Sequence, residues 1–181
     1  MFNSSNTNLV LEEKVRLAIL DHCFRKLEGV YLQGEVREKK AYGLLGGVVS
    51  EKAIRVTVCR PLLRNARHLE PFKSIMDRSM EKFAVPSVTP MDQRGWVAEP
   101  REMFDHLKDF RQQGCNFVGT YHMHRVAWPN DPLRDTPTAL DSALGACSGL
   151  VMLIVSMVSP AQPIFRAFHE GDPQVELVMA P

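Results

Sequence analysis

Two histidines separated by one residue, His122 and His124, have the side-chain type and spacing to hold a metal ion. They end the apolar segment NFVGTYHMH, which is typical of a buried β-strand. Because side chains alternate between the two faces of a strand, both imidazoles share one face and can turn toward one ion. The odd-numbered residues from Phe117 to Met123 are expected on the opposite face.

A carboxylate, Asp141, follows the second histidine in the segment DTPTALD. Thr136 is a good helix N-cap and Pro137 a favoured first helical residue, which predicts Asp141 in the first or second turn of a helix. The helix dipole stabilises a carboxylate there. Two histidines, one carboxylate and an open position for water are the usual layout of a hydrolytic zinc site. Taken alone, the pair His122 and His124 is better explained as ordinary strand residues, one hydrogen-bonded and one solvated.

The surrounding pattern predicts helices that alternate with strands. Helical periodicity runs from Leu11 to Leu27, and Pro100 begins another helix that Gly114 ends. Strands are expected in AYGLLGGVVS, AIRVTVCRPLL, NFVGTYHMH, GLVMLIVSMV and PIFRAFHE, with a last one in QVELVMA. The segment RGWVAEPRE is interpreted as a solvated basic face. This order indicates a mixed α/β (α+β) fold, with a curved mixed sheet sandwiched between helices. One domain over residues 1–181 is expected, with its core from about 11 to 170.

Composition narrows the class of function. The chain has 181 residues and a net charge of +1, which gives no reason to expect nucleic acid as a partner. Its four cysteines form no CxxC pair, which argues against a thiolate zinc site and a deaminase-type centre. No secretory signal is read at the N-terminus, and the most apolar stretch is about half the length of a membrane-spanning helix. A soluble, cytoplasmic protein without a membrane partner is expected.

The wider pattern resembles the JAMM (JAB/MPN, Mov34/PAD-1-like) metalloprotease family, in particular its small stand-alone prokaryotic members. The segments that carry the resemblance are GLLGG (Gly43 to Gly47), RPLLRN (Arg60 to Asn65), GTYHMH (Gly119 to His124) and PTALD (Pro137 to Asp141). The resemblance implies a JAMM/MPN-like fold with cytidine-deaminase-like topology. It also implies a zinc ion held by His122, His124 and Asp141, with Thr138 helping to stabilise an oxyanion.

The same resemblance implies an activity and a substrate. Members of the family use zinc and a glutamate base to hydrolyse a peptide or isopeptide bond at the C-terminal tail of a ubiquitin-like or sulfur-carrier protein. Here Lys40 stands where the family has its glutamate, and an ammonium has no lone pair with which to accept a proton. Glu38, two residues earlier, is the candidate base. The alternatives are a neutral Lys40 and a catalytically inactive scaffold or protein-binding module that still binds metal.

Two further questions stay open in the sequence. The loop between the second histidine and Asp141 is longer than in the family, and at the conventional spacing the carboxylate is Asp135, the rival third ligand. Trp128, within this loop, is either a substrate-contacting residue or an anchor for its own proline-rich segment. The sequence predicts no oligomeric state.

Overall fold

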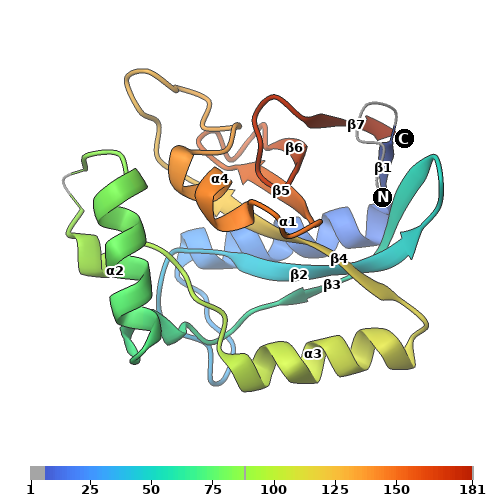
Figure 1. Cartoon of the computed structure of the whole chain (residues 1–181), viewed down its shortest axis with the longest axis horizontal. Helices are drawn as coiled ribbons and strands as arrows, with labels where there is room; N and C mark the ends of the chain where they lie inside the picture. Colours follow the sequence, from blue (N-terminus) through green and yellow to red (C-terminus); the bar gives the residue numbers. More distant parts are fainter. Residues whose placement is uncertain (1–6, 88, 181) are drawn as a thin grey trace.

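The structure, a computed structural model, describes residues 7–87 and 89–180, which form one curved sheet with helices on both faces (Figure 1). The helices are α1 (Glu13–Glu28), α2 (Phe72–Phe83), α3 (Pro100–Gln112) and α4 (Ala139–Gly145). The strands are β1 (Asn8–Leu11), β2 (Tyr42–Val49), β3 (Ala53–Pro61), β4 (Asn116–His124), β5 (Val151–Ser156), β6 (Ile164–His169) and β7 (Glu176–Ala180). Within the described ranges, no helix combines the length and apolarity needed to cross a membrane.

The sheet closes on itself, in the order β1-β3-β2-β4-β5-β6-β7. Closure depends on β1, which pairs in parallel with both β3 and β7, so that Leu9 lies opposite Ile54 on one side and Met179 on the other. The expected mixed α/β class is therefore confirmed, but the expected sandwich is wrong, because the sheet is a closed barrel. A four-residue strand such as β1 is too short to show alternation in the sequence, and it lies outside the core expected from 11 to 170.

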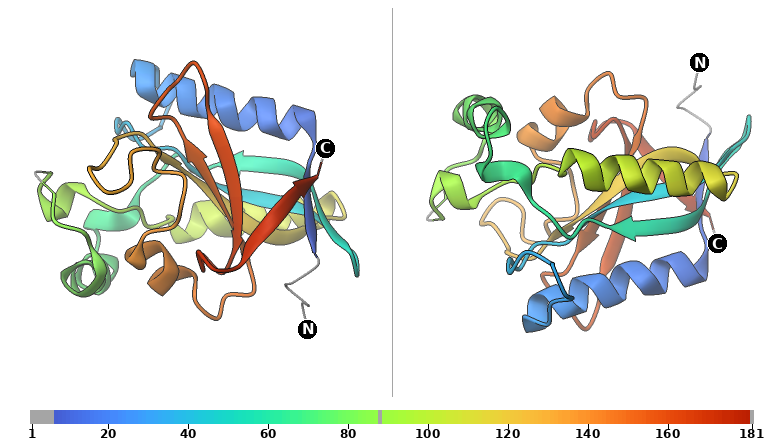
Figure 2. Two further views of the ribbon diagram at one scale, coloured as in Figure 1. Left: turned by 90° about the horizontal axis from the view of Figure 1, so that it is seen from above. Right: turned by 90° about the horizontal axis from the view of Figure 1, so that it is seen from below.

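Helices cover the two faces of the sheet, with α1 on one side and α3 on the other (Figure 2). Val15 and Ile19 of α1 pack in one apolar cluster with Leu45 of β2. Phe110 of α3 packs in a second cluster with Leu44, the neighbouring residue of the same strand. Successive residues of β2 are thus buried on opposite faces, which fixes the strand between the two helices.

Strand β4, which carries the histidines, contains one irregularity. Leu45 pairs with Gly119 and the next residue of β2 pairs with Phe117, so Val118 is an extra residue in β4. Phe117 consequently packs in the α3 cluster, whereas Tyr121 packs in the α1 cluster. The expectation that the odd-numbered residues share one face is wrong at Phe117, because the bulge reverses the alternation. The histidines lie beyond the bulge and keep a common face.

Candidate metal centre

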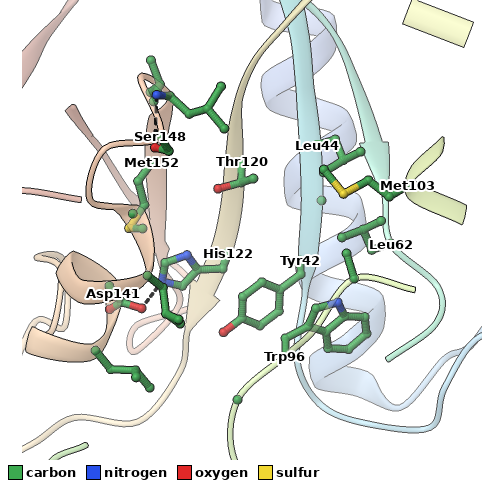
Figure 3. A pocket seen from close by; sticks show the side chains of 18 of the residues that line it. Tyr42, Leu44, Leu62, Trp96, Met103, Thr120, His122, Asp141, Ser148 and Met152 are labelled. Carbon is green, nitrogen blue, oxygen red and sulfur yellow. Dashed lines mark hydrogen bonds and ion pairs between the residues drawn. The ribbon is translucent and has the colours of Figure 1, made fainter. Parts of the chain in front are cut away.

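The end of β4 and the first turn of α4 bring His122, His124 and Asp141 together. The Nε2 atoms of the two histidines are 3.0 Å apart. Asp141 places Oδ1 3.5 Å from Nε2 of His122 and Oδ2 3.7 Å from Nε2 of His124. Both histidines are buried, and Figure 3 shows His122 directed from β4 toward Asp141 on the neighbouring helix. Residues that are distant in the sequence thus form one compact group of nitrogen and oxygen donors.

Asp141 is held by the N-terminus of its own helix. The N-cap is Thr138, not the expected Thr136, and its hydroxyl accepts a hydrogen bond from the Asp141 backbone N–H at 3.2 Å. In return, Asp141 Oδ2 accepts hydrogen bonds from the Thr138 hydroxyl and backbone N–H, both at 2.8 Å. A hydroxyl has one hydrogen, and Thr138 gives it to Asp141 rather than to a substrate oxyanion. Thr138 is therefore a positioning residue in this structure, and Oδ1, which faces His122, is the oxygen that Thr138 leaves free.

His124 is oriented by the long loop between β4 and α4. Its Nδ1 donates to the Arg134 carbonyl oxygen at 2.8 Å, which leaves the Nε2 lone pair directed toward Asp141 and His122. Arg134 has a φ of 49°, unusual for a residue other than glycine. Its guanidinium lies 3.4 Å above the ring of Trp128 and pairs with Asp131 at 3.3 Å. Trp128 is thus an anchor of its own loop, and the loop aims the histidine.

The protonation states suit a cation. Burial lowers the pKa of His122 to about 4, although the Asp141 charge acts in the opposite direction, so the imidazole is neutral near pH 7. Burial alone would raise the pKa of Asp141, but the two histidines and the Thr138 N–H together hold it below its ordinary value. Metal binding requires neutral imidazoles and an ionised carboxylate. His122 and Asp141 therefore have the protonation that a divalent ion needs.

The separations also fit a tetrahedral ion. Zinc bonds to histidine nitrogen and carboxylate oxygen are about 2.0–2.2 Å long, which places two tetrahedral ligands about 3.3 Å apart. The distances of 3.0 Å between the imidazole nitrogens and 3.5 Å from His122 to Asp141 lie close to that value. Three protein ligands leave one position for water or substrate, as in catalytic zinc sites.

The rival carboxylate lies elsewhere. Asp135 forms an ion pair with Arg166 of β6, at 3.3 Å between the carboxylate and the guanidinium. Among the described residues, the donors that converge are His122, His124 and Asp141, without Asp135. The three ligands preferred from the sequence are thus close together, whereas Asp135 connects the loop to the sheet.

The candidate base, Glu38, precedes β2 rather than lying on it, because the strand begins only at Tyr42. Its carboxylate is 2.5 Å from the Lys40 ammonium and accepts a hydrogen bond from the Asn65 side chain at 3.2 Å. Lys40 in turn donates to the Gly95 carbonyl at 3.2 Å. Glu38 and Lys40 therefore neutralise each other, and Glu38 is not in the group of donors formed by His122, His124 and Asp141.

Two aromatic residues at the site were not identified from the sequence. Tyr42 lies opposite His122 in the pairing of β2 with β4, and its ring stacks on the imidazole at 5.2 Å between centroids. Trp96 stacks on the other face of the Tyr42 ring, also at 5.2 Å, and is only 7% exposed. The interpretation of its segment as a solvated basic face is wrong at this residue. Antiparallel pairing of GLLGG with the histidine strand is the signal that could have found Tyr42.

Comparisons with known proteins support the fold alone. No protein-family model matches the sequence, and no curated protein matches it. The solution structure of a Desulfitobacterium hafniense protein is similar with a TM-score of 0.59 and 22% identity, covering 95% of this chain and 91% of that chain. A Salinibacter ruber protein is similar with a TM-score of 0.50 and 19% identity, covering 95% and 90%. At such identities a shared fold carries no shared activity.

Proposed function

We propose that this protein is a zinc-dependent hydrolase that cleaves a peptide or isopeptide bond. The observation that carries the proposal is the buried group of His122, His124 and Asp141, whose donors converge with the protonation and spacing that zinc requires. A zinc ion in such a site supplies Lewis acidity toward water and toward an amide carbonyl. The resemblance to the JAMM family, which covers the same three residues, points to the same reaction.

The residues around the ligands have separable roles in this proposal. Thr138 and the Arg134 carbonyl fix the orientation of Asp141 and His124. We assign to Glu38 the removal of a proton from the attacking water. Like burial and the charge of Asp141, the charge of Glu38 raises the pKa of the Tyr42 phenol, which lies beside His122. Burial and these two carboxylates raise the pKa of Tyr42, so the phenol stays protonated and can donate a hydrogen bond.

The proposed substrate is the C-terminal tail of a ubiquitin-like or sulfur-carrier protein, as the family resemblance implies. The supporting observation is that two cavities border the centre. One, of about 250 Å³, is lined by His122 and Asp141. The other, of about 410 Å³, is lined by His124, Lys40 and Trp128. An extended segment of chain could therefore approach the ligands from one cavity and leave through the other.

The test begins with the metal. Purified protein should bind one zinc ion per chain in titration calorimetry, His122→Ala should lose that binding, and the exposed His68→Ala should retain it. The zinc-loaded protein should then cleave a ubiquitin-like protein fused through its tail to a reporter, and a chelator should stop the cleavage reversibly. Absence of stoichiometric zinc binding in the wild type would refute the proposal.

The ion pair between Glu38 and Lys40 favours a second candidate function, a metal-binding scaffold or protein-binding module without hydrolysis. In this arrangement the Glu38 carboxylate is engaged by the Lys40 ammonium and the Asn65 side-chain amide. If Glu38 is the base, Glu38→Gln should lower kcat at least about a hundredfold with unchanged zinc affinity. If the wild type and Glu38→Gln both bind zinc fully and neither cleaves the substrate, the scaffold function is supported instead.

A further inference from the structure

The cavity on the α3 side of the metal centre is markedly apolar. It begins at His122 and Asp141 and measures about 250 Å³. Its walls include residues of β2, α2, α3, β4, α4 and β5, and among the large apolar side chains that line it are Leu44, Leu62, Met76, Met103, Leu144 and Met152. An apolar cavity of about 150 Å³ is known to hold a benzene ring, so this one has room for a group larger than a phenyl ring. Three unbranched methionine side chains can adapt their shape to an apolar guest.

One donor in the cavity wall has no acceptor. Trp96 is 7% exposed, and its ring Nε1 has no hydrogen-bond partner among the described residues. Figure 3 shows its ring beneath Tyr42 and beside Leu62, at the wall of the cavity. A buried indole N–H usually finds a partner, since leaving it unpaired costs about 1–3 kcal/mol. An acceptor supplied by a bound ligand would remove this penalty once the side chains that cover the N–H move aside.

We propose that this cavity binds one large apolar side chain of the substrate, next to the scissile bond, and that the Trp96 indole donates to a carbonyl of the same ligand. The inference rests on the proposed hydrolase function and adds a side-chain preference to it. A ubiquitin-like tail that ends in glycines would leave the cavity empty on its own side of the bond. The residue that fills the cavity is therefore on the leaving-group side and is of the leucine, methionine or phenylalanine class.

The cavity has space to extend beyond this one side chain. A neighbouring cavity of about 320 Å³ shares Met76, Trp96, Ala98 and Leu144 with it and continues along α2. Leu144 lines both cavities and is half exposed, so it stands in their shared wall without belonging to the core. Enlarging this residue should obstruct the guest and leave the fold intact.

The experiment measures binding of N-acetyl amides of glycine, alanine, leucine and phenylalanine to the full-length protein by NMR, first without metal and then with zinc. Each buried methylene adds about fourfold in affinity, so the leucine amide should bind at least tenfold more tightly than the glycine amide. The indole N–H resonance of Trp96, assigned from Trp96→Phe and Trp128→Phe, should shift on binding. Trp96→Phe should weaken the leucine amide roughly three- to tenfold.

Leu144→Trp should abolish the preference for leucine, whereas the matched Leu17→Trp, at an exposed position of α1, should keep it. Equal affinities for the glycine and leucine amides, or an unmoved Trp96 resonance, would overturn the inference. The measurement without metal separates it from the proposed function. If the protein prefers the leucine amide but does not bind zinc, the hydrolase proposal fails and the cavity inference stands. If it binds zinc but shows no amide preference, the cavity inference fails and the hydrolase proposal stands.

Discussion

The choice between two aspartates shows how single residues define this centre. Asp141 and Asp135 lie six positions apart, yet one faces the histidines and the other pairs with Arg166. Asp141→Asn removes a charged ligand, which should lower zinc affinity more than the roughly 10–100-fold typical of outer-shell changes. Asp135→Asn should leave affinity within about threefold of the wild type, since Asp135 pairs with Arg166 and is not among the converging donors. Calorimetry of both variants decides between them, and the opposite order would make Asp135 the ligand.

On the other face of β4 lies a second buried group of titratable residues, which leads to a prediction about a single side chain. His22 of α1 contacts the Tyr121 hydroxyl at 2.9 Å and the Glu35 carboxylate at 3.4 Å, and Lys26 lies 3.3 Å from that carboxylate. Burial lowers the pKa of His22 to about 4; the Glu35 charge opposes this shift, while Arg25 and Lys26 reinforce it. The unfolded chain, in which histidine titrates near its ordinary pKa of about 6.5, therefore binds the proton first.

Because the unfolded state binds more protons between about pH 6.5 and 4, stability should fall as the pH falls through that range. His22 should account for about 2 kcal/mol of the loss between pH 7 and pH 5. Urea unfolding of the wild type and of His22→Gln at both pH values measures this contribution, because the variant keeps the other titrating groups. Equal losses in the two proteins would contradict it, as would an NMR titration of His22 near 6.5.

At the scale of elements, the first turn of α4 joins secondary structure to ligand geometry. Thr138 caps the helix and also holds Asp141 Oδ2, so one side chain serves both purposes. Thr138→Ala should destabilise the metal-free protein by about 1 kcal/mol and lower zinc affinity roughly tenfold. Thr138→Ser, which keeps the hydroxyl, should retain both properties. Unfolding and calorimetry are the measurements, and a normal zinc affinity in Thr138→Ala would show that the cap does not position the ligand.

For the whole molecule, the decisive contact is the closure of the sheet by β1 and β7. Two adjacent residues of β7 provide a matched test, because Leu177 is 3% exposed and Val178 is 67% exposed. Leu177→Ala should destabilise the protein by about 2–5 kcal/mol through loss of core packing, and Val178→Ala by less than about 0.5 kcal/mol. Denaturant unfolding of both variants tests the closure, and similar effects of the two would be inconsistent with a buried inner face of β7.

Several features follow from the sequence alone, because they depend on neighbours along the chain. The period of two in β4 places His122 and His124 on one face, and the sequence around Asp141 forms a capped helix that begins two residues later than expected. The mixed class of the fold follows from the order of helical and extended patterns. Propensity, alternation and capping act over a few residues, so their outcome is visible in a short segment.

Other features were decided only by the tertiary structure, because they depend on contacts between distant segments. The path of the loop from Arg125 to Pro137 selects Asp141 over Asp135, and the pairing of β2 with β4 stacks Tyr42 on His122. Packing buries Trp96 although its segment is polar, and β1 closes the barrel although four residues carry no periodic signal. Local sequence specifies which donors exist, whereas the chain's route through space specifies which of them meet.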